Sequence, residues 1–176
     1  MPLKTTSTNS VPAFLAMAVM NASSQLEAAG ANVVHLEVGQ PSSPPPEAVN
    51  SALAGALAQT STHGYSVAFG ETALRQRIAA HYGDFYDVAA DPDRIVITPG
   101  SSLGFALAFL AAFDRGDRIA LATPGYPAYR NLMLALGIEP VLLPARAAEG
   151  WVPELEALAA NGAPLPDGIL LASPAN

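Results

Sequence analysis

The chain has 176 residues, enough for one domain, and 51% are hydrophobic while 13% are charged, so we expect a packed core. Eight basic residues against 15 acidic ones give a net charge of −7 without any basic cluster, which argues against nucleic-acid and anionic-membrane partners. The absence of cysteine excludes disulfides and cysteine-ligated metals, and the three histidines lack metal-ligand spacing, so no metal site is expected.

The N-terminal segment predicts an amphipathic helix that Gly30 is placed to end. The apolar residues that share one helical face are Leu15, Val19, Ala22 and Leu26. A signal peptide is the alternative, because an apolar stretch follows Lys4. Pro12 interrupts that stretch, and the helical face continues beyond any cleavage point. No stretch is long enough to span a bilayer, and we expect a cytoplasmic protein.

Up to about residue 90 the pattern is mixed. A short strand is expected in "VVHLEVGQP", and Pro46 and Glu47 suit the first turn of a helix that continues to Leu57. An irregular "THGYSVAFG" follows, and a second helix is expected from about Glu71.

From Arg94 onward strands and helices alternate. The expected strands are "RIVIT", "DRIALAT", "IEPVLLP" and "GILLAS", and the expected helices are "SSLGFALAFLAAF", "PAYRNLMLALG" and "VPELEALAANG". The residues expected on the buried side of the first of these helices are Leu103, Leu107, Leu110 and Phe113. Such alternation predicts an α/β fold with a mainly parallel sheet covered by helices on both faces. Ligands of such sheets bind beyond the carboxyl ends of the strands, at "TPGSS", "ATPGYPAY" and "SPAN".

The first of these turns has the features of a phosphate site. Gly100, Ser101 and Ser102 stand between a predicted strand and the start of a helix. Backbone N–H groups and the helix dipole attract an anion there, and the serine hydroxyls could donate further hydrogen bonds. The alternative is simple capping, since serine is a preferred N-cap residue.

The same turn also fits the G-x-S-x-G nucleophile elbow of serine hydrolases, over Gly100–Gly104. Ser102 would then be the nucleophile, and His63 with Gly64 a conceivable oxyanion loop. That hydrolase order places the histidine after the serine, whereas all three histidines precede Ser102. The chain therefore offers Ser102 no base in the required order.

Five short motifs, taken in order, resemble those of the class I/II aminotransferases, which are fold-type I pyridoxal-phosphate enzymes. They are "VVHLEVGQPSSPPPEAV", "HGYSVAFGETALRQRIAAHY", "ITPGSS", "ATPGYPAY" and "SPAN". The resemblance implies an N-terminal helical or irregular segment followed by the first half of the family's helix-covered sheet. It divides the chain into an arm and small-domain segment, residues 1–45, and the first part of the large cofactor-binding domain, residues 46–176.

The resemblance also implies a role for individual residues. The turn Gly100–Ser102 matches the cup for the phosphate of pyridoxal 5′-phosphate, and Tyr126 matches the aromatic ring that stacks on the pyridine. Asn176 matches the asparagine that hydrogen-bonds the pyridoxal 3-oxygen. Tyr65 matches the tyrosine that reaches the cofactor phosphate of the partner subunit, and Gly39 lies where the family backbone meets the substrate. These parts meet the needs of the cofactor, namely a phosphate anchor, a stacking face and a donor to the phenolate oxygen.

One part of the family's machinery has no match in this sequence. The only lysine is Lys4, which precedes every cofactor motif, so no residue here is expected to serve as the Schiff-base lysine. We therefore expect the 176 residues to be inactive alone and to be the front part of a longer enzyme. We also expect the strands around Ile95–Thr98 and Ile169–Ala172 to lack their sheet partners.

Three classes of function follow. The first is an aminotransferase that moves an amino group from an amino acid to a 2-oxo acid as a homodimer, with carbon–sulfur lyases, decarboxylases and cyclopropane-forming synthases as relatives of the same fold. The second is a serine hydrolase that uses Ser102. The third is a non-enzymatic module that binds the cofactor.

Overall fold

The computed structural model describes residues 11–158 and 164–175. The chain forms two compact units: residues 1–37 together with 100–176 make the first, and residues 38–99 make the second. The division at residue 45, which the resemblance implies, concerns family domains and stays a prediction.

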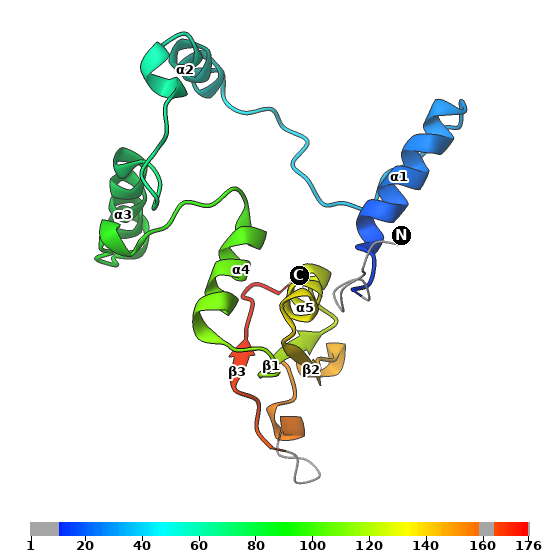
Figure 1. Ribbon diagram of the computed structural model, residues 1–176. Helices are drawn as coiled ribbons and strands as arrows, with labels where there is room; N and C mark the ends of the chain where they lie inside the picture. Colours follow the sequence, from blue (N-terminus) through cyan, green and yellow to red (C-terminus); the bar gives the residue numbers. More distant parts are fainter. Residues whose placement is uncertain (1–10, 159–163, 176) are drawn as a thin grey trace, which may run out of the picture. The chain divides into compact units, whose positions relative to one another are not determined.

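A three-stranded parallel sheet forms the centre of the first unit (Figure 1). β1 (Arg118–Thr123) lies between β2 (Glu139–Pro144) and β3 (Gly168–Leu170). Because β1 is hydrogen-bonded on both sides, its apolar run is buried from Ile119 to Leu121. The predicted α/β class with a parallel sheet is therefore confirmed.

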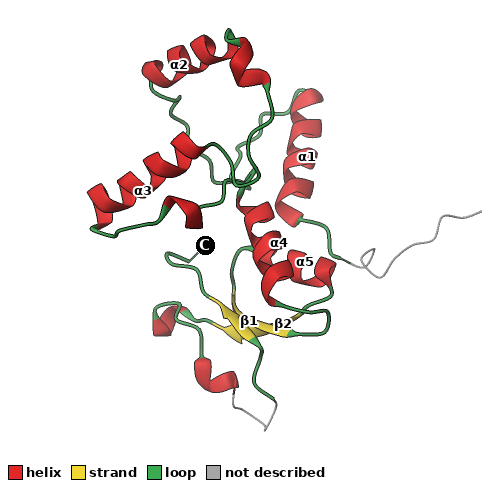
Figure 2. Cartoon of the chain, turned by 60° about the vertical axis from the view of Figure 1, so that its left-hand side comes forward, coloured by secondary structure: helices red, strands yellow, loops and turns green. Residues whose placement is uncertain are grey.

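Helices α4 (Ser101–Ala112) and α5 (Pro127–Leu136) lie on one side of this sheet (Figure 2). Their buried side chains meet those of the sheet in one core, which consists of Phe109, Ile119, Leu121, Met133 and Ile138. The bounds of α5 follow from local signals: proline occupies its first position, and Gly137 ends it in the left-handed conformation at φ 81°.

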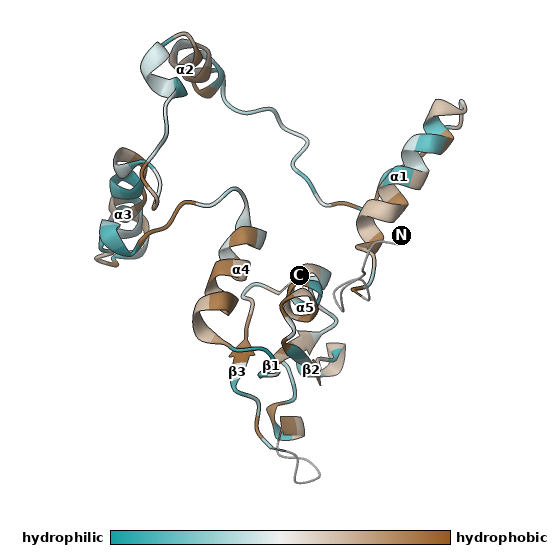
Figure 3. Ribbon diagram, viewed as in Figure 1, coloured by the Kyte–Doolittle hydropathy of each residue, from teal (hydrophilic) through white to brown (hydrophobic). Residues whose placement is uncertain are grey.

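The prediction that three leucines lie on the buried side of α4 is wrong. Leu103, Leu107 and Leu110 are between 42% and 65% exposed, and Phe109 is buried in the core instead. Phe113 does pack against the core, as expected. The reason is that α4 is apolar almost all round, as its brown ribbon shows (Figure 3), so periodicity alone does not select the face.

The N-terminal helix is confirmed as α1 (Leu15–Ala28), and Gly30 follows it at φ 91°. Its expected apolar face is mostly exposed, and the buried residue is Ser23, whose hydroxyl donates to the Val19 carbonyl at 3.0 Å. Just before α1, the amide of Asn131 donates to the Pro12 carbonyl at 3.2 Å, which ties the entry of the helix to α5.

Three expected elements differ from the structure. Residues 33–38 and 95–98 are not strands, and the expected helix over 152–162 is replaced by a 3₁₀ turn at Leu155–Leu158, with residues 159–163 outside the described part. A strand must pair with a neighbouring strand, and residues 33–38 and 95–97 pair with no other strand among the described residues. The expectation that the stretch 95–98 lacks its sheet partner stays a prediction. Residues 169–170, in contrast, pair with β1, which corrects the expectation for that strand.

The second unit contains the two expected helices, α2 (Glu47–Leu57) and α3 (Thr72–Tyr86). Short 3₁₀ turns follow them at Thr60–His63 and Pro92–Arg94. In the part of the chain that the structure describes, no helix is both long and apolar enough to cross a bilayer.

Candidate cofactor site

The carboxyl end of β1 leads into a turn that presents Tyr126. Tyr126 is the residue just before α5, and its half-buried ring packs edge-on against Phe14 at 5.9 Å and Tyr129 at 5.3 Å. Gly125 precedes it where a Cβ atom would lie 2.8 Å from the carbonyl oxygen of Ala122, so only glycine fits this turn. The turn therefore holds an aromatic ring at the sheet edge where the sequence predicted a ligand.

The two-serine turn begins α4. Gly100 is the N-cap at φ 85°, a conformation that favours glycine, and no side chain caps the helix. Ser101 and Ser102 occupy the first two helical positions and are exposed. The serines thus do not serve as side-chain caps, and their hydroxyls stand beside the positive end of the helix dipole.

Both turns lie at the carboxyl edge of the sheet. The end of α4 is close to the start of β3, because a Cβ on Gly168 would meet the Phe113 ring at 2.6 Å. The start of α4 is therefore at the opposite, carboxyl edge, from which α5 also begins. The rings of Phe105, in the second turn of α4, and Tyr129, in the first turn of α5, pack edge-on at 4.7 Å and join the two helices near their starts.

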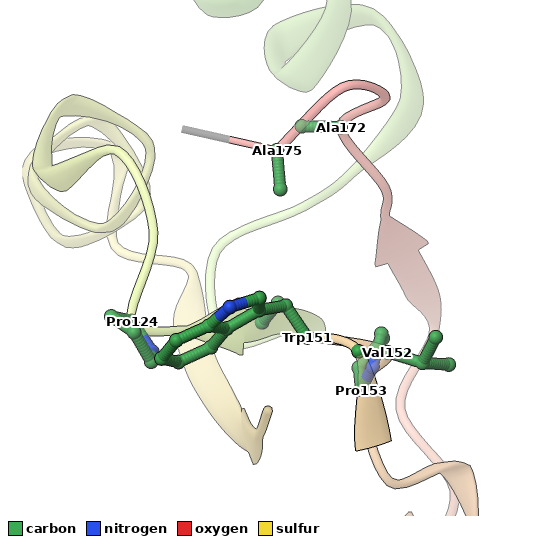
Figure 4. A pocket seen from close by; sticks show the side chains of 8 residues that line it. Pro124, Trp151, Val152, Pro153, Ala172 and Ala175 are labelled. Carbon is green, nitrogen blue, oxygen red and sulfur yellow. The ribbon is translucent and has the colours of Figure 1, made fainter. Parts of the chain in front are cut away.

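A cavity of about 600 Å³ opens at the same edge (Figure 4). Its wall consists of Ala122, Pro124, Gly150, Trp151, Val152, Pro153, Ala172 and Ala175. The indole of Trp151 extends toward Pro124, and its backbone has φ 64°, which is rare for a large side chain. Our sequence reasoning missed Trp151; the signal was available, since the chain's one tryptophan follows the strand "IEPVLLP" shortly after its carboxyl end.

The other predicted site residues are not assembled here. Asn176 lies outside the described residues, although its neighbour Ala175 is on the cavity wall. Gly39 and Tyr65 belong to the second unit; the Tyr65 side chain is fully exposed, and a Cβ on Gly39 would meet no atom within 4 Å. Their roles stay predictions.

No histidine supports the hydrolase interpretation. The His63 Nε2 atom is 2.9 Å from the Leu57 carbonyl oxygen, and the His35 ring lies between the carboxylates of Glu27 and Glu37. His35 is the histidine of the first unit, to which Ser102 also belongs, and its ring nitrogens contact Glu27 and Glu37 rather than Ser102. Across residues 11–158 and 164–175, no cluster of His, Asp or Glu could hold a metal ion.

Within the first unit, the residues at the carboxyl edge of the sheet fit pyridoxal phosphate. The phosphate can be bound by the serine hydroxyls and the first-turn amides of α4, because glycine at the N-cap has no side chain that could occupy those amides. Tyr126 supplies an aromatic ring at the same sheet edge, and Gly125 lets the backbone turn sharply enough to present it. The anchor and the ring are two of the three parts of a cofactor site that this unit was expected to contain; the third, Asn176, lies outside the described residues.

Comparison with known proteins agrees with this fit. A family model described as "Aminotransferase class I and II" matches residues 31–176. Valine–pyruvate aminotransferase of Mycobacterium tuberculosis is 46% identical over 166 residues, which cover 94% of this chain and 42% of the relative. A (5-formylfuran-3-yl)methyl phosphate transaminase of Methanocaldococcus jannaschii is 36% identical over 128 residues, or 73% of this chain and 34% of the relative.

Solved structures show the same relationship. The crystal structure of an aminotransferase from Mycobacterium tuberculosis matches 99% of this chain and 45% of its own length, with a TM-score of 0.90 and 43% identity. A putative aminotransferase from Silicibacter pomeroyi matches 99% of this chain and 43% of its own length, with a TM-score of 0.81 and 45% identity. This chain spans less than half the length of these relatives. On the family match and these likenesses, the chain belongs to the class I and II aminotransferase family.

Proposed function

We propose that the protein to which this chain belongs is a pyridoxal-phosphate-dependent aminotransferase, which moves an amino group from an amino acid to a 2-oxo acid. The observation that carries the proposal is the start of α4. Gly100 begins the helix without a side-chain cap, two exposed serines follow, and Tyr126 lies at the same edge of the sheet. Membership in the family supports the same conclusion.

Each residue has a physical role in this proposal. Bound pyridoxal phosphate supplies an electron sink for bond breaking at the substrate α-carbon. Gly100–Ser102 bind the phosphate group through hydroxyls and backbone N–H groups, and Tyr126 packs on the cofactor ring and excludes water from that face. Asn176 donates a hydrogen bond to the 3-oxygen. Lys4 precedes every cofactor motif and is not proposed as the reacting amine.

The relatives also support a substrate class and an assembly. The 46% identity to valine–pyruvate aminotransferase favours an aliphatic amino acid as the donor and pyruvate as the acceptor. We propose a cytoplasmic homodimer in which Tyr65 reaches the cofactor phosphate of the partner subunit and Gly39 lies against the substrate.

The phosphate site can be tested with a cofactor form that needs no lysine. Pyridoxamine 5′-phosphate carries its own amine, and its binding can be followed by quenching of Trp151, the chain's one tryptophan. We expect the double variant Ser101→Ala/Ser102→Ala to weaken binding by about tenfold or more, because it removes hydrogen bonds to a charged phosphate.

Pyridoxamine, which lacks the phosphate, should bind the double variant and the native chain equally. Ser51→Ala is the matched control, since Ser51 is an exposed helical serine of the second unit. Equal affinity of native chain and double variant for pyridoxamine 5′-phosphate would rule out the assigned phosphate anchor. The activity itself is tested on the whole protein, which should form L-alanine from pyruvate when L-valine is the amino donor. A whole protein that binds the cofactor but transfers no amino group would contradict the proposed aminotransferase activity.

A further inference from the structure

Trp151 is held in a conformation that large side chains rarely adopt. Its φ is 64°, and it follows Gly150, which also has φ 64°. The Trp151 N–H donates to the Arg146 carbonyl at 2.9 Å, and the Gly150 N–H donates to the Ala147 carbonyl at 3.1 Å. Burial of the indole does not offset the strain, because Trp151 stays 53% exposed. Strained residues of this kind gather at ligand sites, so the exposed indole has to be explained.

Both ends of the turn that carries Trp151 are fixed to the sheet. Before it, the Ala145 N–H donates to the carbonyl of Thr123, the last residue of β1, at 2.9 Å. After it, the Glu154 N–H donates to the carbonyl of Pro144, the last residue of β2, at 2.9 Å. The indole is therefore held at the carboxyl edge of the sheet, within the first unit.

The cavity of about 600 Å³ beside Trp151 has an apolar wall (Figure 4). Alanine, proline, glycine, valine and tryptophan form that wall, and none of its eight residues has an ionisable side chain. An aliphatic group gains free energy when it leaves water for such a wall, whereas an unpaired carboxylate loses free energy there. The wall thus fits an aliphatic side chain and opposes an acidic one.

The same cavity adjoins the ring of Tyr126. A smaller hollow of about 30 Å³ is lined by Tyr126 and Tyr129. The two hollows share four wall residues, namely Ala122, Pro124, Ala172 and Ala175. A ligand bound at Tyr126 therefore has the Trp151 cavity as its direct neighbour.

We propose that Trp151 determines specificity, because its indole forms a wall of the site for the aliphatic side chain of the amino donor. This inference rests on the proposed function, which assigns the cofactor ring to Tyr126. The isopropyl group of L-valine has more apolar surface to bury against the indole than the methyl group of L-alanine. The side-chain carboxylate of L-aspartate would be unpaired there.

The test uses the whole protein with its cofactor bound and two unreactive acids. The acids 3-methylbutanoate and propanoate are L-valine and L-alanine without the amino group, so the ratio of their affinities measures recognition of the side chain alone. We expect the native protein to favour 3-methylbutanoate by about tenfold or more, since even one methylene group in a fitted apolar pocket is worth about 10–200-fold. Isothermal titration calorimetry gives both dissociation constants.

Two variants of the indole test its role. Trp151→Ala should remove most of the preference for 3-methylbutanoate, and Trp151→Phe, which keeps an aromatic wall, should retain most of it. The ratio of kcat/KM for L-valine and L-alanine should change in the same way. A general loss of stability would weaken both acids alike and leave the ratio unchanged. Leu155→Ala is the matched control, because Leu155 is 50% exposed and is not part of the cavity wall.

The outcomes separate the two proposals. A native affinity ratio in Trp151→Ala overturns the role of Trp151, and so does a native protein that binds both acids equally. Succinate, which is L-aspartate without its amino group, should bind more weakly than propanoate, and tighter binding of succinate also overturns the apolar site. A protein that favours 3-methylbutanoate through Trp151 but transfers no amino group supports the cavity and contradicts the proposed function, which is a different result.

Discussion

The two units of the chain are held together by different means. Every apolar residue that is fully buried among the described residues lies in the first unit, around β1, α4 and α5. In the second unit the one fully buried residue is Arg75, while large apolar side chains such as Leu53 and Phe85 are exposed. A parallel sheet with helices on one side buries apolar surface, whereas α2 and α3 alone do not. The first unit should therefore lose stability through its core, and the second through a few local contacts.

The largest expected effect tests the core of the first unit. Met133 is 0% exposed, and Met133→Ala should lower the free energy of unfolding by about 2–5 kcal/mol through lost burial and a cavity. The matched variant in the second unit is Leu53→Ala. Leu53 is 57% exposed, so its truncation should change the free energy of unfolding by about 0.5 kcal/mol or less. Chemical denaturation followed by circular dichroism measures both. Equal losses would remove the distinction between the units.

A smaller effect is expected at the turn before Tyr126. Gly125→Ala places a Cβ 2.8 Å from the Ala122 carbonyl oxygen, so backbone must move, at a cost of about 1–3 kcal/mol in unfolding free energy. Gly64→Ala in the second unit meets nothing within 4 Å and should be close to neutral. The denaturant midpoints of the two variants give the comparison, and a neutral Gly125→Ala would mean that the turn is looser than the structure shows.

The smallest effect is a pH dependence at exposed residues outside the core. The His35 ring lies between carboxylates, with Nδ1 2.7 Å from Glu37 and Nε2 3.0 Å from Glu27. Hydrogen bonds to Glu37 and then to Glu27 raise the pKa of His35 from 6.5 to about 9, and the bond to His35 lowers the pKa of Glu37. His35 therefore binds its proton more tightly in the folded state than in the unfolded state. The pairs of protonated His35 with the two carboxylates stabilise the folded state below pH 6.5, as long as both carboxylates stay ionised. This stabilisation is lost as the pH rises to about 9.

An NMR titration of the His35 ring should therefore give a pKa well above 6.5, near 9. In His35→Gln the change in stability between pH 6.5 and 9 should be smaller than in the native chain. A His35 pKa near its ordinary value of 6.5 would show that the ion pairs do not form in solution.

Local sequence signals predicted several elements well. Proline at the start and glycine at the end define α5, and Glu47 begins α2 after Pro46, because caps and fixed backbone angles act over a few residues. The strand β1 was predicted from its continuous apolar run. The motif order also led to the family, which the match over residues 31–176 confirms.

Other features depended on partners distant in the sequence. An apolar "RIVIT" does not become a strand without a neighbouring strand beside it, and the buried face of α4 depends on where the sheet lies. The position of Trp151 at the carboxyl edge and the burial of Arg75 beside the 3₁₀ turn Pro92–Arg94 also became visible only in three dimensions.

By itself, then, the sequence determined the α/β class, most helix bounds, the order of the cofactor motifs and the family. Those properties depend on backbone preferences and on short patterns within a few residues. The tertiary structure alone decided which apolar faces are buried, which extended segments pair, and that Gly70 requires the absence of a side chain beside Ile97. These depend on contacts between residues far apart along the chain, which no local pattern specifies.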